Sequence, residues 1–335
     1  MKKETTSGFI VFFILLLCAG ACIWYTKSHK DEKAAQYSVI NPTGNPSGYS
    51  TDTIDIKKSG NEYIAALYVE GTIEDANSTY NQAWLLSTIN RLKKDDNNVA
   101  IAMYVNSPGG GVYQADEVYF ALKAYKNKGK KLYVYMGPLA ASGGYYISCP
   151  ADKIYANRNS LTGSIGVIAG QLIDATELLD DIGITIEAIH SGRNKLMGNF
   201  YSKITSEQEE IMQSISDECY EQFVSIVAND RNMNLEEVKK LADGRVYTAT
   251  QAVRNHLIDG IRDWDNMIGE IRSDVDIADC KVITYKYEHK QTFRESVFGI
   301  ISDIQNKSVA ARLGLPVSVL NDMENFNSYP AYLYK

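Results

Sequence analysis

Histidine is scarce in this sequence, which limits the side chains that can serve as a general base. The 335 residues hold only four histidines: His29, His190, His256 and His289. None of them lies within forty residues of Ser142, which sits between alanines and glycines in GPLAASGGYY. That setting suits a nucleophile, yet its base is not close in the sequence. Only His190, in IEAIHSGRNK, is a candidate imidazole, because the others read as surface or packing residues.

Metal and disulfide signatures are also missing. The five cysteines lie at positions 18, 22, 149, 219 and 280, without a CxxC pair or a Cys/His cluster at metal-ligand spacing. We therefore expect no metal, no cofactor and no disulfide framework, and we interpret the cysteines as mostly buried thiols.

Basic residues are fewer than acidic ones. Lys and Arg number 34 against 41 Asp and Glu, a net charge of −7. Residues 1–33 carry five lysines and three acidic residues, so the remainder stands near −9, from −7 − 2. A chain this acidic, with no basic stripe, is a poor nucleic-acid binder, and we expect no nucleic-acid partner.

The long apolar segment of the chain stands near its N-terminus. Residues 8–25, GFIVFFILLLCAGACIWY, contain no charge and would span about 27 Å as a helix. We predict a retained transmembrane anchor there, after a short N-terminus of residues 1–7. The alternatives are a cleaved signal peptide, because residues 19–21 resemble a cleavage site, and a lipoprotein site at Cys22. Lysines flank both ends, so charge leaves the orientation open.

The rest of the chain divides into a linker, a domain and an extension. Residues 26–60 are polar and rich in Ser, Asn, Gly and Pro, which is typical of a flexible linker. Residues 61–275 alternate apolar runs, glycine turns and helical stretches, which predicts an α/β fold with a largely parallel sheet. Residues 276–335 form a C-terminal extension. The expected strands are residues 63–69, 98–105, 130–136 and 151–156.

A long amphipathic helix is expected over residues 206–229. Ser206 and Glu209 have the spacing of a capping box at its start. Its apolar residues recur every four positions and predict a buried stripe: Ile211, Ile215, Cys219 and Phe223.

Two glycine-rich stretches carry the chemical signal. NSPGGG (106–111) and AASGG (140–144) each follow a predicted strand. Removing side chains there lets backbone N–H groups approach a ligand closely, and a helix N-terminus favours a developing anion. Together they predict an oxyanion hole beside Ser142. The alternative is that the glycines serve tight packing and that Ser142 is only an N-cap.

Lys195 is the second candidate base. It lies in SGRNK, after the strand-like run ITIEAI (184–189). A lysine can act as a base when burial in an apolar pocket lowers its pKa, but a loop lysine is usually solvated. Spacing alone does not choose between His190 and Lys195.

The motifs NSPGGG, AASGGYYIS, SLTGSIGV, SGRNK and ADGRVYTATQA, in this order over residues 63–265, resemble the bacterial signal peptide peptidases of the SppA type. The resemblance implies a serine peptidase with a Ser/Lys dyad. The nucleophile falls on Ser142 and the general base on Lys195, with Ser164 orienting the lysine. The oxyanion donors fall on Gly110 and Gly143.

The same resemblance implies the fold, the assembly and the substrate. The fold is a ClpP/crotonase-like superhelix of repeated strand-turn-helix units. In the single-length form, protomers assemble into a ring or dome, expected to be an octamer, and neighbours contribute Ser and Lys to one site. The anchor leaves the catalytic domain outside the cytoplasmic membrane.

The substrates implied are remnant signal peptides and other short apolar peptides, bound as extended strands. Val112, Met136 and Leu139 are candidate pocket walls. The apolar tail YPAYLYK could lie in the groove of a neighbouring copy.

Three alternatives remain. A ClpP-like Ser-His-Asp peptidase would use His190, but such enzymes carry their histidine about 25 residues past the serine, where this chain reads SIGVIAG. A crotonase-type acyl-CoA enzyme would also use paired backbone donors but would need neither Ser142 nor Lys195. The third is an inactive homologue that serves as a membrane-tethered scaffold.

Overall fold

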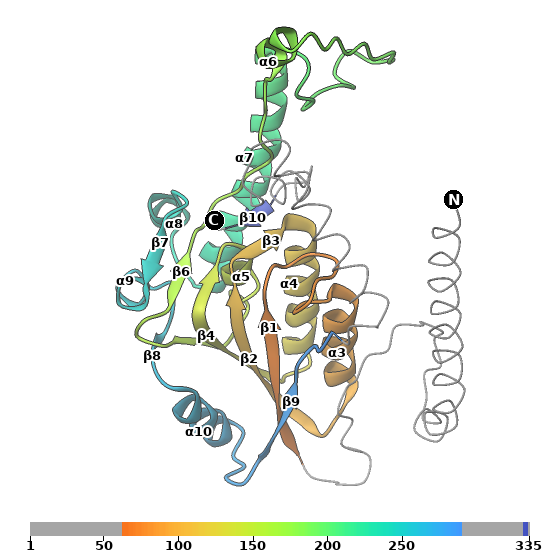
Figure 1. The fold of residues 1–335 in the computed structure, drawn as a ribbon. Coiled ribbons are helices and arrows are strands. Elements are labelled where there is room, and N and C mark those ends of the chain that lie inside the picture. The colour runs from red at the N-terminus through yellow and green to blue at the C-terminus, as the bar shows by residue number, and fades with distance from the viewer. Residues whose placement is uncertain (1–61, 290–330, 334–335) are drawn as a thin grey trace, which may run out of the picture. The chain divides into compact units, whose positions relative to one another are not determined.

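A computed structural model describes residues 62–289 and the backbone of residues 331–333 (Figure 1). The chain divides into two compact units, Met1–Gly48 and Tyr49–Lys335, and every described residue belongs to the second. The predicted anchor at residues 8–25 and the linker lie outside the described residues. Between residues 62 and 289, no helix is both long and apolar enough to cross a membrane.

The described strands and helices alternate along most of the chain. The strands are β1 (Tyr63–Glu70), β2 (Asn98–Ser107), β3 (Gly109–Gly111), β4 (Lys131–Ala141), β5 (Lys153–Ala156), β6 (Leu161–Gly163), β7 (Val246–Thr248), β8 (Gly260–Ile261), β9 (Lys281–Tyr285) and β10 (Ala331–Leu333). The helices are α3 (Gln82–Lys94), α4 (Val112–Lys126), α5 (Gly143–Tyr146), α6 (Thr176–Asp181), α7 (Ser206–Asp230), α8 (Leu235–Leu241), α9 (Ala249–Arg254) and α10 (Trp264–Asp274).

The main sheet is largely parallel, as the alternating sequence pattern predicts. Its strand order is β7-β6-β4-β2-β1-β9, with β5 beside β4 and β8 beside β5. Among its pairs, β6 with β7 is antiparallel and the others are parallel. The sheet includes β9, so it continues past residue 275, where we placed the end of the domain.

Apolar side chains cover both faces of the sheet, which is typical of parallel sheets. In β1, Tyr63, Ala65 and Leu67 face the core cluster shared with α3 and α4. The alternate residue Ile64 faces a second cluster with Met267 of α10, because successive side chains of a strand point to opposite faces. This two-sided burial fixes the register of the strands and hence the positions of the turns that follow them.

Residues 170–222 differ from the body because none of their side chains is buried. We call this segment the arm. It contains α6 and the first part of α7, and Figure 1 shows α7 leading away from the sheet toward α6. Large apolar side chains are exposed along it: Ile173, Leu178, Ile182, Ile184, Ile186, Ile189, Phe200 and Ile215.

Three local predictions fail in or beside the arm. The run ITIEAI (184–189) is irregular and forms no strand. The capping box of α7 is made by Thr205 and Gln208, one residue earlier than predicted, because Thr205 takes the extended N-cap conformation. In the expected buried stripe, Phe223 is buried but Ile215 is exposed, because the arm has no core to cover it.

Candidate active site

Ser142 lies at the turn between β4 and α5 and has the features of a nucleophile. Its backbone is strained, with φ 54° and ψ −118°, a conformation that costs a non-glycine residue about 1–3 kcal/mol. Its side chain is only 1% exposed, and its Oγ has no hydrogen-bond partner within the described residues. A strained strand-to-helix turn is a known way to present a serine hydroxyl at a sheet edge.

Gly110 and Gly143 meet beside this serine. Gly143 is the residue after Ser142 and opens α5, while Gly110 is the middle residue of β3. A Cβ added to Gly143 would stand 3.1 Å from the backbone nitrogen of Gly110 and 3.2 Å from the Cα of Gly109. The structure thus brings together the two glycines to which the family resemblance assigned the oxyanion donors, and only residues without side chains allow this approach.

Ile73, which the sequence analysis did not single out, supports one edge of β3 through backbone hydrogen bonds. The Ile73 N–H donates to the Gly109 carbonyl and the Gly111 N–H donates to the Ile73 carbonyl, both at 2.8 Å. Because backbone groups alternate along a strand, the N–H and C=O of Gly110 face away from Ile73. The short run GTI after the first strand gave no signal for this role.

The open edge of β3 accepts a strand from the C-terminus. In β10, Ala331, Tyr332 and Leu333 pair antiparallel with Gly111, Gly110 and Gly109, respectively. The tail expected to lie in a neighbour's groove is therefore paired with β3 of its own chain. This edge can bind an extended segment by main-chain hydrogen bonds, the mode known as strand addition.

Ser164 lies immediately beside the Ser142 turn. The Ser142 N–H donates to the Gly163 carbonyl at 2.7 Å, and Ser164 is the next residue. Ser164 is 6% exposed with φ 50°, and its N–H donates to the Arg245 carbonyl at 2.8 Å. The LTGSIG motif and the AASGG motif thus share one edge of the sheet.

Lys195 lies apart from the serine's hydrogen bonds. It is exposed in an irregular part of the arm. Its two preceding residues are held by α7, since Arg193 forms an ion pair with Glu207 and the Asn194 amide donates to Glu207 Oε1 at 3.1 Å. His190 is also exposed, with its Nδ1 at 3.2 Å from the Gly192 carbonyl. Since Ser142 Oγ has no partner, neither candidate base contacts it within the described chain.

The three candidate pocket residues differ in exposure. Val112, the first residue of α4, and Leu139 in β4 are half-buried. Met136 is wholly buried in the main core cluster, between neighbouring strands.

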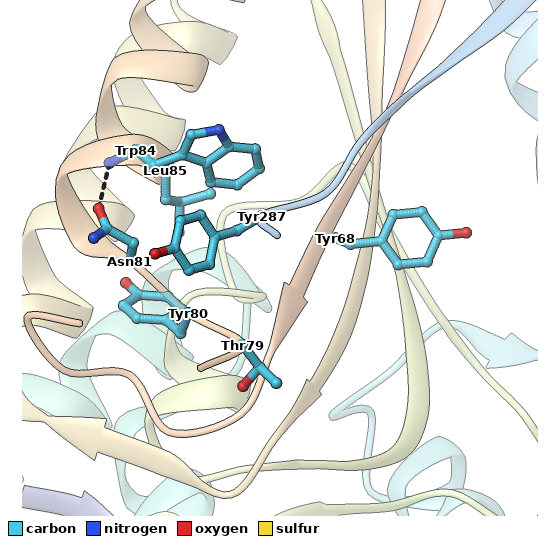
Figure 2. Close-up of a pocket in the computed structure, with 7 residues that line it drawn as sticks. All are labelled: Tyr68, Thr79, Tyr80, Asn81, Trp84, Leu85 and Tyr287. Carbon is cyan, nitrogen blue, oxygen red and sulfur yellow. Dashed lines mark hydrogen bonds between the residues drawn. The ribbon is translucent and has the colours of Figure 1, made fainter. Parts of the chain in front are cut away.

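A separate aromatic hollow lies between the end of β1 and the start of α3 (Figure 2). The centroid of the Trp84 ring lies 5.8 Å from that of the Tyr287 ring. The backbone N–H of Trp84 donates to the side chain of Asn81. None of its lining residues is a candidate catalytic residue: Tyr68, Thr79, Tyr80, Asn81, Trp84, Leu85 and Tyr287.

Parts of this sequence are similar to known proteins. The model of peptidase family S49 matches residues 124–278. A protein of Enterococcus faecium named "Putative signal peptide peptidase SppA" is 35% identical over 235 residues, which are 68% of each chain. "Protease 4" of Salmonella typhi is 33% identical over 211 residues, covering 62% of this chain and 34% of that protein.

Among solved structures, a variant of ClpP1 from Listeria monocytogenes matches with a TM-score of 0.41 and 17% identity. The match covers 61% of this chain and 94% of that one. The sequence relatives are sufficient by themselves: the chain belongs to peptidase family S49 and is a serine peptidase.

Proposed function

We propose that the chain is a membrane-anchored endopeptidase that uses Ser142 and Lys195 to hydrolyse remnant signal peptides and other short apolar peptides. The observation that carries this proposal is the buried, unpartnered hydroxyl of Ser142 on a strained turn, with Gly110 and Gly143 next to it. A hydroxyl left without a partner in the interior costs free energy unless a base or a substrate completes the site.

The proposed chemistry has two stages. Neutral Lys195 takes the proton of Ser142 while Oγ attacks the scissile carbonyl carbon, and the N–H groups of Gly110 and Gly143 stabilise the oxyanion. The protonated lysine returns its proton to the leaving amine, and an acyl-enzyme remains on Ser142. Water, deprotonated by the same lysine, then attacks the ester carbonyl, and the lysine returns that proton to Ser142 Oγ as the acid product leaves. Ser164, one residue beyond the carbonyl that binds the Ser142 N–H, orients the lysine.

A neighbouring copy supplies the lysine in this proposal. Within the described residues, Lys195 is exposed on the arm and Ser142 has no base. The exposed apolar side chains of the arm favour a protein interface, since such surfaces are rarely left in contact with water. A ring or dome, of eight copies by the family resemblance, would cover them and place each Lys195 at the next Ser142.

The substrate is proposed to bind as an extended strand on β3. β10 demonstrates that an antiparallel strand fits this edge, with its middle residue opposite Gly110. Val112 and Leu139 are half-buried and remain proposed pocket walls, together with the deeper Met136.

The wider organisation is also part of the proposal. It comprises a single-pass anchor at residues 8–25, a linker over 26–60, a peptidase domain with a ClpP/crotonase-like superhelix from residue 61, and a C-terminal extension, expected after residue 275 and here taken to follow β9. The catalytic domain would face the extracytoplasmic side of the cell membrane.

The test is hydrolysis of a fluorogenic peptide with an apolar residue before the scissile bond, by the full chain in detergent between pH 6 and 11. We expect a rate that rises toward alkaline pH, because the mechanism needs the neutral form of the lysine. Ser142→Ala and Lys195→Ala should abolish it, while His190→Ala should leave it nearly unchanged. Activity that survives Lys195→Ala but not His190→Ala would establish a histidine base instead.

A further inference from the structure

A short chain of hydrogen bonds joins α7 to the turn that carries Ser142. The Tyr146 hydroxyl donates to Asp116 Oδ1 at 2.7 Å and accepts from the Gln222 amide at 2.7 Å. Tyr146 belongs to α5, and its own N–H donates to the Ser142 carbonyl at 2.9 Å. One phenol therefore connects α4, α7 and the nucleophile turn.

Aromatic packing also holds α7 and α4 against α5. The Tyr146 ring lies 5.0 Å from the Phe223 ring of α7 and 5.6 Å from the Tyr119 ring of α4. Tyr146 and Phe223 are both wholly buried. Gln222 and Phe223 are therefore the point where α7 reaches α5, and a shift of α7 there must shift Tyr146 as well.

The other end of α7 holds the Lys195 segment. Glu207, in the first turn, binds Arg193 and Asn194, the two residues before Lys195. Between Glu207 and Gln222 the helix contains no Pro or Gly, and fifteen residues at 1.5 Å each span about 22 Å. Helices without such residues seldom kink, so the two ends move together. Figure 1 shows α7 as one continuous helix from the arm to the body.

We propose that α7 is a rigid connector and that Gln222 and Tyr146 are positioning residues for the chain's own Ser142. When the arm docks on a neighbouring copy, it delivers Lys195 to that copy and α7 becomes fixed. The Gln222–Tyr146 contact then holds the Ser142 turn of the same chain in its active conformation. Each copy therefore orders its own nucleophile turn when it donates Lys195 to its neighbour. This inference rests on the proposed Ser142–Lys195 site shared between copies.

The test compares three variants of the full chain in the peptide assay. Gln222→Met removes the amide donor at an exposed position of α7 and leaves a side chain of similar length. Tyr146→Phe removes the hydroxyl where α7 meets α5. Tyr145→Phe is the matched control, because Tyr145 is an equally buried tyrosine of α5 whose hydroxyl binds the Leu257 carbonyl at 2.9 Å rather than α7.

We expect Gln222→Met and Tyr146→Phe to lower kcat about five- to tenfold, the size expected for one lost hydrogen bond, with KM within about twofold. The unfolding temperature of Gln222→Met should fall no further than that of Tyr145→Phe, since each loses one hydrogen bond. Tyr145→Phe should lower the unfolding temperature as Tyr146→Phe does while keeping the parent kcat. A parent kcat in Gln222→Met, or equal losses of kcat in Tyr145→Phe and Tyr146→Phe, would overturn the proposal.

Assemblies that mix two variant chains show whether Gln222 acts on the Ser142 of its own chain. A mixture of Ser142→Ala and Lys195→Ala chains has active sites only where one copy lends its lysine to the other. Adding Gln222→Met to the Lys195→Ala chains, which hold the working serine, should lower the rate five- to tenfold. Adding it to the Ser142→Ala chains should leave the rate unchanged, and the reverse pattern would refute a role for Gln222 in positioning its own serine. If the parent mixture is silent while the unmutated enzyme is active, the shared site itself is wrong.

Discussion

Replacing Gly110 with alanine perturbs the strand that supports the proposed oxyanion hole. A Cβ at this position would lie 1.9 Å from the carbonyl oxygen of Ile73, 2.5 Å from its carbonyl carbon and 2.7 Å from its nitrogen. All three are backbone atoms, so no rotation of a side chain relieves the clash. Either β3 or the Ile73 segment must move.

The movement affects both stability and catalysis. Overpacking of this kind costs about 1–3 kcal/mol. The two hydrogen bonds between Ile73 and the flanking glycines, each 2.8 Å long, contribute about 0.5–1.5 kcal/mol apiece and would be strained. We expect Gly110→Ala to lose about 2–6 kcal/mol of unfolding free energy if both hydrogen bonds are lost. Displacing the Gly110 N–H from the oxyanion should lower kcat by about 10²–10³.

The assay measures kcat and KM with the fluorogenic peptide and the free energy of unfolding in urea. Gly269→Ala is the matched control, because Gly269 lies within α10 and nothing stands within 4 Å of an added Cβ. That variant should keep kcat and gain up to about 1 kcal/mol of stability. A folded Gly110→Ala enzyme with the parent kcat would refute the assignment of the Gly110 N–H as an oxyanion donor.

Three further outcomes are expected. Deleting residues 331–335 should raise kcat/KM severalfold, because β10 occupies the β3 edge proposed for substrate; unchanged kinetics would remove that binding site. Burial raises the pKa of the Cys149 thiol, so in the native protein at pH 8 this residue should resist a disulfide-exchange reagent that labels it in urea. Burial also raises the pKa of Tyr125 and Tyr145, so these phenols are protonated in the folded state while their unfolded counterparts ionise near pH 10. Their contribution to stability should therefore be constant below that pH and be lost above it in urea titrations; a rise in stability above pH 10 would contradict the burial of these hydroxyls.

Much of the body of the domain was readable from the sequence. The helix that follows NSPGGG, Val112–Lys126, agrees with the predicted alternation of strands, glycine turns and helices, and the first two strands begin where the apolar runs begin. Because parallel strands end at one sheet edge, the turns that follow β2 and β4 had to approach each other. This is why the NSPGGG and AASGG motifs could be paired from the sequence, whereas the choice of Gly110 within NSPGGG came from the family resemblance.

The features that escaped prediction depend on long-range contacts or on their absence. Ile73 supports β3 through backbone groups, which leave no trace in residue type. The pairing of β10 with β3 joins segments more than 200 residues apart. The stripe at Ile215 is apolar but faces no core among residues 62–289, so periodicity identified the helix and misjudged its burial. The Gln222–Tyr146 contact likewise joins two residues whose spacing gave no signal.

The most direct test of the shared Ser142–Lys195 site is the activity of mixed assemblies. Ser142→Ala and Lys195→Ala chains are purified separately, unfolded, mixed in equal amounts and refolded together with detergent, alongside each variant alone. Each variant alone should be inactive, and the mixture should recover a substantial fraction of the parent rate, because a Lys195 from one chain meets a Ser142 from the other. A mixture as silent as its components, beside a parent enzyme that refolds with full activity, would show that serine and lysine act within one chain.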